Sequence, residues 1–181
     1  MSKPWVLCIV ACACVAVISG GNFGAAIWST RAINQCDEPN HKFKTVIKLM
    51  DINETHDGFY GDVELVEDFT EEYGVRLDIS KLVEDEFKQF DVIYDDNLFN
   101  FFDKYAHKYV VGCFNAVGIN PPALPIPKGN YKINEYVYSK EIMPGLFGTY
   151  MIKLYIVKDN LDEGCIEIQI EGEEVEQKTE E

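Results

Sequence analysis

The chain is poor in histidine and in positive charge. Its 181 residues include 3 His, and 16 Lys and Arg stand against 31 Asp and Glu, which gives a net charge of −15. So acidic a protein is repelled by phosphate backbones and by anionic lipid surfaces, which argues against nucleic acid as a partner and against stable membrane insertion. With so few histidines and no closely spaced cysteine pair outside the N-terminal segment, we expect no metal site.

Sequence patterns of common catalytic sites are also absent. The chain has no Gly-x-Ser-x-Gly, no His-Glu-x-x-His and no glycine loop of the kind that cradles phosphate. Ser80 and Ser139 have no histidine near them in the sequence. His41, His56 and His107 lie in polar settings, which predicts exposed side chains. We therefore expect a protein that is not an enzyme and that carries no cofactor.

One apolar run is present, at the start of the chain. It covers residues 5–18, follows Lys3, and ends at the small residues Ser19, Gly20 and Gly21. Its 14 residues fall short of the ~20 that a membrane-spanning helix needs. We predict a signal peptide over residues 1–21, with Ala16 as an alternative cleavage position, and a secreted, extracellular protein. Its removal takes Lys3 and no acid, so 15 basic and 31 acidic residues remain, a net charge of −16.

Three cysteines lie in the predicted signal peptide, and Cys36, Cys113 and Cys165 remain after its removal. In an oxidising compartment an odd number allows one disulfide and one leftover thiol, or a bridge between two chains. All three cysteines stay candidates for the disulfide. The segment Asn53-Glu54-Thr55 is a glycosylation sequon. Together with the residues up to Gly58 it predicts a turn between two strands, where a glycan on Asn53 would be tolerated.

Alternation of apolar and polar residues predicts most of the remaining structure. We assign residues 22–171 to a single domain and residues 172–181, which are rich in glutamate, to a disordered acidic tail. Strands are predicted at residues 42–50, 59–69, 73–79, 87–94, 131–138, 150–157 and 165–171. In the last of these, Ile166, Ile168 and Ile170 alternate with polar residues.

One segment has helical periodicity. After Asp96, the expected N-cap, the residues Leu98, Phe101, Tyr105 and Tyr109 recur at helical spacing and predict a helix at about 96–111. A proline-rich stretch at residues 121–127 then predicts extended chain. With short turns at 128–130, 144–145 and 159–164, the pattern indicates a mostly β protein. We expect an antiparallel β-sandwich or β-cup of about seven strands with one helix.

The C-terminal half resembles a known family. The segment Leu124-Pro125-Ile126-Pro127-Lys128-Gly129-Asn130-Tyr131-Lys132-Ile133-Asn134-Glu135-Tyr136 is followed by Ile142-Met143-Pro144-Gly145-Leu146-Phe147-Gly148-Thr149-Tyr150 and by a strand pair that ends at Glu171. This arrangement resembles the insect secreted proteins related to the ganglioside activator. They include the chemosensory CheB proteins and lie near the ML lipid-recognition superfamily. The chain departs from them where it has Asn97 and Leu124 in place of two cysteines.

The resemblance implies a β-cup whose apolar cavity holds a lipid or another hydrophobic small molecule, with semiochemicals among the candidates. An aromatic content of 13% is compatible with such a cavity, although aromatic residues at helical spacing equally suit a filled core. The candidate cavity residues are Phe43, Val63, Leu65, Leu77, Phe101, Tyr105, Tyr131, Ile133, Ile152 and Leu154. The alternative is a secreted accessory ligand that binds a cell-surface receptor, since an acidic surface suits a basic partner.

Overall fold

The computed structural model describes residues 25–37, 41–116, 124–140, 142–144 and 147–174. The described strands are β1 (Ala25–Gln35), β2 (Phe43–Asn53), β3 (His56–Leu65), β4 (Gly74–Val83), β5 (Glu86–Asp95), β6 (Gly129–Ser139), β7 (Ile142–Pro144), β8 (Gly148–Lys158) and β9 (Leu161–Glu174). The helix α2 (Leu98–Ala116) lies between β5 and β6 in the sequence. The predicted signal peptide falls outside the described residues.

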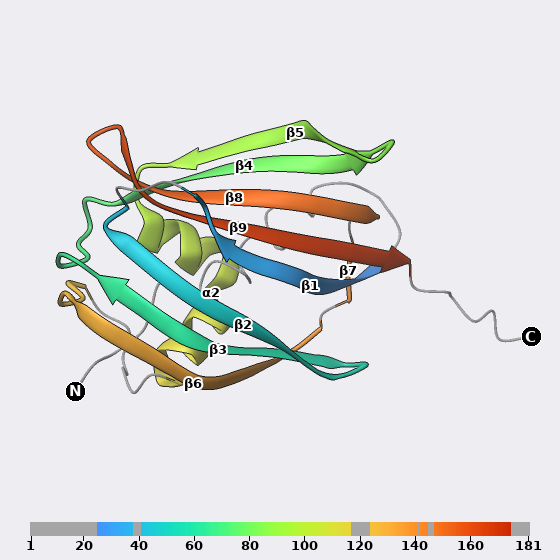
Figure 1. The fold of residues 1–181 in the computed structure, drawn as a ribbon, viewed down its shortest axis with the longest axis horizontal. Helices are drawn as coiled ribbons and strands as arrows, with labels where there is room; N and C mark the ends of the chain where they lie inside the picture. Colours follow the sequence, from blue (N-terminus) through green and yellow to red (C-terminus); the bar gives the residue numbers. More distant parts are fainter. Residues whose placement is uncertain (1–24, 38–40, 117–123, 141, 145–146, 175–181) are drawn as a thin grey trace, which may run out of the picture.

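The strands form two antiparallel sheets with α2 between them (Figure 1). The larger sheet has the order β5-β4-β8-β9-β1-β7, and the smaller has the order β2-β3-β6. The helix contacts β4 of the larger sheet and β6 of the smaller one. The predicted fold class, a mostly β sandwich or cup with one helix, is confirmed.

Each of the seven predicted strands is present, and the structure adds β1 and β7. Ala26 and Trp28 of β1 are buried, and so is Ile33, but a register shift between Thr30 and Ala32 changes the parity of the buried positions. This β-bulge breaks the alternation by which a strand is recognised in a sequence. Strand β7 has only three residues, too few to give any pattern.

Two tight turns fix the hairpins of the larger sheet. Residues 84 and 85 connect β4 to β5, with φ values of 52° and 67°. Asp159 and Asn160 connect β8 to β9, with φ values of 53° and 61°. Two successive residues of positive φ are typical of the type I′ turn, whose twist matches that of the strands it joins. Strand β9 therefore starts at Leu161, inside the predicted turn, and its last three residues belong to the predicted tail.

The helix begins one residue later than predicted. Asn97, rather than Asp96, is the N-cap, since its Oδ1 accepts a hydrogen bond from the backbone N–H of Asn100 at 2.8 Å. The N–H of Leu98 donates to the carbonyl of Tyr73 at 2.8 Å, which ties the start of the helix to the beginning of β4. The helix continues to Ala116, and the side chain of Tyr109 lies outside the described part.

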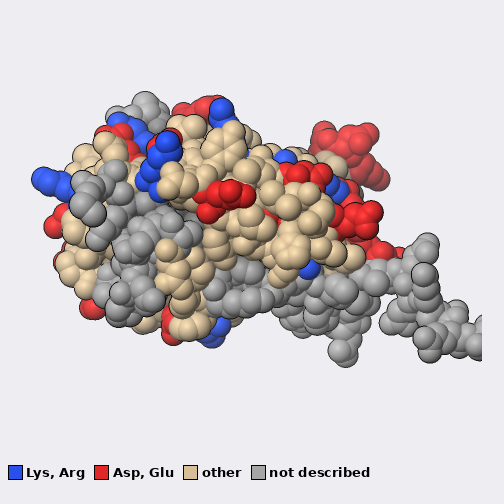
Figure 2. Space-filling view, turned by 90° about the horizontal axis from the view of Figure 1, so that it is seen from below, with Lys and Arg blue, Asp and Glu red and all other residues tan. Residues whose placement is uncertain are grey.

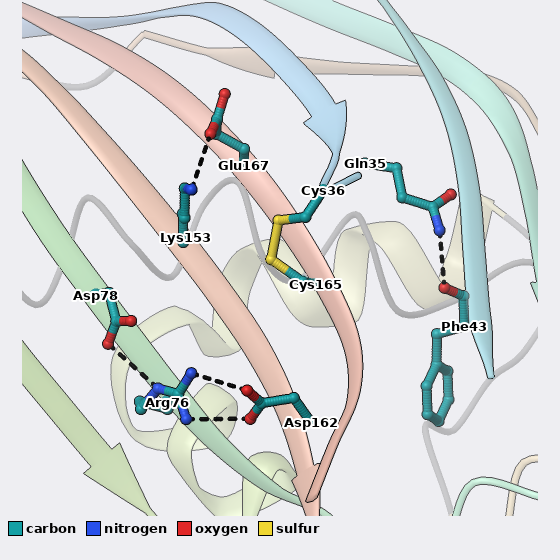
Figure 3. Close-up of a disulfide and its surroundings, with 9 residues drawn as sticks. All are labelled: Gln35, Cys36, Phe43, Arg76, Asp78, Lys153, Asp162, Cys165 and Glu167. Atoms are coloured by element: carbon teal, nitrogen blue, oxygen red, sulfur yellow. Dashed lines mark hydrogen bonds and ion pairs between the residues drawn. A yellow bond between two sulfur atoms is a disulfide. The ribbon is translucent and has the colours of Figure 1, made fainter. Parts of the chain in front are cut away.

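The two sheets are joined at one end, which we call the disulfide end (Figure 3). Here the Cys36–Cys165 bridge links the residue after β1 to β9. The Gln35 side chain spans the sheets, since its Oε1 accepts from the N–H of Thr45 at 2.9 Å and its Nε2 donates to the carbonyl of Phe43 at 3.4 Å. Towards the opposite, far end, where the β2–β3 and β4–β5 turns lie, β1 and β2 diverge (Figure 1).

Candidate ligand-binding interior

The inner faces of both sheets are apolar. Eight of the ten candidate cavity residues lie on these faces, and Phe101 and Tyr105 lie on α2 between the sheets. Nine of the ten are at most 4% exposed, and Tyr105 is half-buried. Phe43, Val63, Leu65, Leu77, Phe101, Tyr131, Ile152 and Leu154 belong to the main core cluster, against which Tyr105 packs. Ile133 belongs to a second, smaller cluster. Their role as ligand contacts stays a prediction.

Aromatic rings fill the interior at the disulfide end. Phe69 and Tyr73 stack at 4.7 Å between ring centroids, and Phe43 meets both rings edge-on at 5.7 and 5.3 Å. All three residues are at most 3% exposed. Interlocking rings of this kind are typical of a packed core, because edge and face contacts leave little space. This end fits the filled-core alternative.

The second cluster lies towards the far end, on the inner face of the smaller sheet. It combines buried Phe59 and Ile133 with the half-buried side chains of Ile47, Leu49, Tyr136 and Tyr138. The Tyr138 hydroxyl donates to Oγ1 of Thr30 at 3.1 Å and so connects β6 to β1 of the other sheet. Its half-buried aromatic residues make this part of the interior less enclosed than the disulfide end.

A charged cluster closes the disulfide end from outside. Lys42 Nζ lies 3.2 Å from Glu67 and 3.0 Å from Glu163, and the Tyr73 hydroxyl donates to Glu67. The hydrogen bond from Tyr73, followed by Lys42, lowers the pKa of Glu67. Burial and the bond to Glu67 together raise the pKa of Tyr73. The phenol therefore stays protonated and acts as a structural donor.

A polar pocket lies between the sheets at the far end. We call it the seam pocket, because it lies where β1 of the larger sheet faces β2 and β3 of the smaller one. Its lining residues are Thr30, Arg31, Leu49, Met50, Asp51, Asp57 and Lys140, and its volume is about 280 Å³. Two other pockets formed by described residues lie beside Cys36 and beside Leu124. None of the ten candidate cavity residues lines these three pockets.

Asp57 is the site residue that the sequence interpretation placed wrongly. It was expected in the turn after Asn53, but β3 begins at His56, so the turn consists of Glu54 and Thr55. Asp57 is only 7% exposed. Its spacing of two residues from Phe59 is the signal that could have placed it on the inner face.

Two of the three histidines are less exposed than predicted, since His56 is half-buried and His41 is buried. His41 is 6% exposed, so its predicted exposure is wrong, whereas His107 is exposed and contacts Asp103. His41 lies directly before β2, where the two sheets converge, and the polar residues around it in the sequence do not reveal this packing.

The disulfide and the sequon lie in defined places. Of the three candidate cysteines, Cys36 and Cys165 form the bridge, and the Cys113 side chain falls outside the described part. Asn53 is exposed, and its Oδ1 accepts hydrogen bonds from the N–H groups of Thr55 and His56 at 2.9 Å each. The predicted turn between two strands is confirmed, and glycosylation of Asn53 stays a prediction.

In the described residues, no three or more His, Cys, Asp and Glu side chains gather in a way that could hold a metal ion. No described helix has both the length and the apolar character needed to cross a membrane. Comparison with known protein families and with curated proteins finds no match for the chain.

Proposed function

We propose that this chain is a secreted, non-enzymatic binding protein that holds a lipid or another hydrophobic small molecule between its two sheets. The observation that best supports this proposal is the second cluster, which forms an apolar, half-buried surface on the inner face of the smaller sheet. The two sheets are joined at the disulfide end and diverge at the other, so a ligand enters from the far end. The resemblance to the ganglioside activator group points to the same kind of ligand.

The direct test is native mass spectrometry of the protein secreted from eukaryotic cells, followed by organic extraction. We expect a one-to-one complex with an extractable hydrophobic molecule, and stoichiometric uptake of a fluorescent alkyl probe by the stripped protein. A protein that is secreted empty and also excludes the probe contradicts the proposal.

Leu49→Trp is the variant that should block uptake. Leu49 is half-buried and packs against both clusters, so a larger ring there occupies the space next to Phe59 without being forced into the central core. We expect the probe affinity to fall by about tenfold or more, the effect of losing roughly 50 Å² of apolar contact. Lys48→Trp, on the exposed outer face of the same strand, is the matched control and should bind the probe normally. Equal affinities for the two variants would place the ligand elsewhere.

A second candidate function is contact with a receptor protein, and β5 is the observation that favours it. This strand lies at the edge of the larger sheet and exposes Phe87, Phe90, Val92 and Tyr94. An edge strand with apolar side chains is a surface to which another chain can add a strand. If the protein acts through a receptor, Val92→Lys should abolish association with that partner. If it acts as a carrier, the same substitution should leave uptake of the alkyl probe unchanged.

The proposal places the protein outside the cell, which can be tested on the same secreted material. The N-terminal residue of the mature chain should be Asn22, or Val17 if the earlier cleavage position is used. A glycan on Asn53 should add mass that Asn53→Gln removes, because this asparagine lies on an exposed turn. Retention of residues 1–21 on the purified protein would contradict the signal peptide, and a mass that Asn53→Gln leaves unchanged would contradict the glycan.

A further inference from the structure

Strand alternation puts a carboxylate on the apolar inner face of the smaller sheet. Asp57 precedes Phe59 by two residues in β3, and it pairs with Asp51 of β2 on one side and with Tyr138 of β6 on the other. At 7% exposure it is nearly as buried as the core around it. A carboxylate in such a place costs several kcal/mol unless its oxygens are paired or hydrogen-bonded.

Only one of the two carboxylate oxygens of Asp57 has a partner. Oδ1 lies 3.2 Å from Nζ of Lys140, and Oδ2 is buried without a hydrogen-bond partner. Nζ of Lys140 also donates to the carbonyl of Asn53 at 3.1 Å and lies 3.8 Å from Asp51. Buried polar atoms in native proteins are nearly always satisfied, so an orphan acceptor beside a pocket points to a donor that comes from outside the chain.

Both cations of the seam pocket already have carboxylate partners. Arg31 is held by Glu171 and Glu173 at 2.7 Å each, and the hydrogen bond to Glu171 raises its pKa. Lys140 is held by Asp57 and Asp51. A ligand carboxylate would have to displace these acids, and an ammonium group would have to share Asp57 with Lys140. A neutral hydroxyl needs only the one unused acceptor.

The surface around the far end also disfavours anions. Figure 2 shows acidic side chains gathered towards the end where β9 finishes. Glu84 and Asp85 of the β4–β5 turn and Glu86, the first residue of β5, are exposed at the same end. Their field repels a negatively charged head group before it reaches the pocket.

The seam pocket borders the apolar interior through two of its lining residues. Leu49 lines the pocket and packs against both apolar clusters. Thr30 lines the pocket and accepts the hydrogen bond of Tyr138, a member of the second cluster. An alkyl chain that lies against Phe59 can therefore place its end group beside Asp57.

We infer that the ligand is a neutral amphiphile whose hydroxyl group occupies the seam pocket and donates a hydrogen bond to Oδ2 of Asp57. The inference rests on the proposed function and adds the chemical class of the head group. It favours a long-chain alcohol, or another uncharged hydroxyl-bearing lipid, over a fatty acid or a hydrocarbon. The volume of about 280 Å³ also leaves room for a head group larger than one hydroxyl.

The test compares three probes with the same chain: 1-hexadecanol, its methyl ether and hexadecanoic acid. Each displaces a fluorescent alkyl probe from the wild-type protein at pH 7. We expect the alcohol to bind about tenfold or more tightly than the ether, because only the alcohol can donate to the carboxylate. The acid should bind more weakly than the alcohol.

Asp57→Asn should reduce the preference for the alcohol over the ether to less than about twofold, because an amide N–H donates to either oxygen. Asp62→Asn, on the exposed face of the same strand, is the matched control and should keep the wild-type preference. The wild-type comparison needs no variant, so poor folding of Asp57→Asn does not prevent the test. Tight but equal binding of alcohol and ether overturns this inference alone. Failure of all three probes and of the fluorescent probe to bind overturns the proposed function as well.

Discussion

Removing the Cys36–Cys165 disulfide is expected to lower the free energy of unfolding by about 4 kcal/mol. The bridge joins residues 129 positions apart, so it closes most of the domain into one loop. A cross-link over so long a loop stabilises a protein mainly by restricting its unfolded chain. Typical domains have only about 5–15 kcal/mol of stability, so this loss is large. The measurement is the denaturant midpoint of the double variant Cys36→Ser, Cys165→Ser.

Cys113→Ser is the control, because it removes a cysteine and keeps the bridge. Any shift of its midpoint measures the loss of a thiol alone, and the double variant should lose more than this. The double variant should still take up the alkyl probe at low denaturant concentration, since the ladder between β1 and β9 remains and holds the same strands together. A double variant that unfolds at the wild-type midpoint would show that the unfolded chain is already compact without the bridge.

The sequence was most informative where one face of a strand is fully buried. At the start of β4, the alternation of Tyr73, which directly precedes the strand, with Val75, Leu77 and Ile79 matches a row of side chains that are at most 1% exposed. Such a row forms because a one-residue slip would expose every apolar side chain of the strand. The alternation specifies which face is buried, and it leaves open which strand lies next to it. The pairing of β4 with β8, far away in the sequence, could not be predicted for this reason.

The disulfide pairing could not be predicted because it depends on β1, a strand that the sequence pattern does not reveal. Cys36 directly follows β1, and the bulge in β1 concealed that strand. Once β1 is known to pair with β9, with Gln35 opposite Ile166, the neighbouring Cys36 and Cys165 are necessarily close. Asp57 was missed for a different reason. The polar residues that follow the sequon have a high local propensity for turns, which predicts that Asp57 lies in a turn. The pairing of β3 with strands on both sides overrides this propensity.

Gly61→Ala is expected to lower the free energy of unfolding by about 3 kcal/mol, an effect of the size that overpacking a core produces. Gly61 lies in β3, the central strand of the smaller sheet, next to a register shift against β6. A Cβ atom there would lie 2.1 Å from the carbonyl oxygen of Val46 and 3.0 Å from Cα of Ile47. Both obstacles are backbone atoms of β2, so the strands themselves would have to separate. Thermal or denaturant unfolding measures the loss.

Gly112→Ala adds the same methyl group at a position where it meets a side chain. Comparison with Gly61→Ala therefore shows how the cost of a clash with a side chain differs from that of a clash with the backbone. The Cβ added at Gly112 would lie 2.6 Å from the hydroxyl of Tyr136, which is the far end of a half-buried side chain and not a backbone atom. The change also favours the helix by about 0.8–1 kcal/mol, so we expect little net change in stability. Displacing Tyr136 should nevertheless alter alkyl-probe affinity, because this ring belongs to the second cluster. Equal losses of stability in the two variants would show that α2 is held against β6 as rigidly as β2 is held against β3. The helix would then belong to a filled core and would not move to admit a ligand.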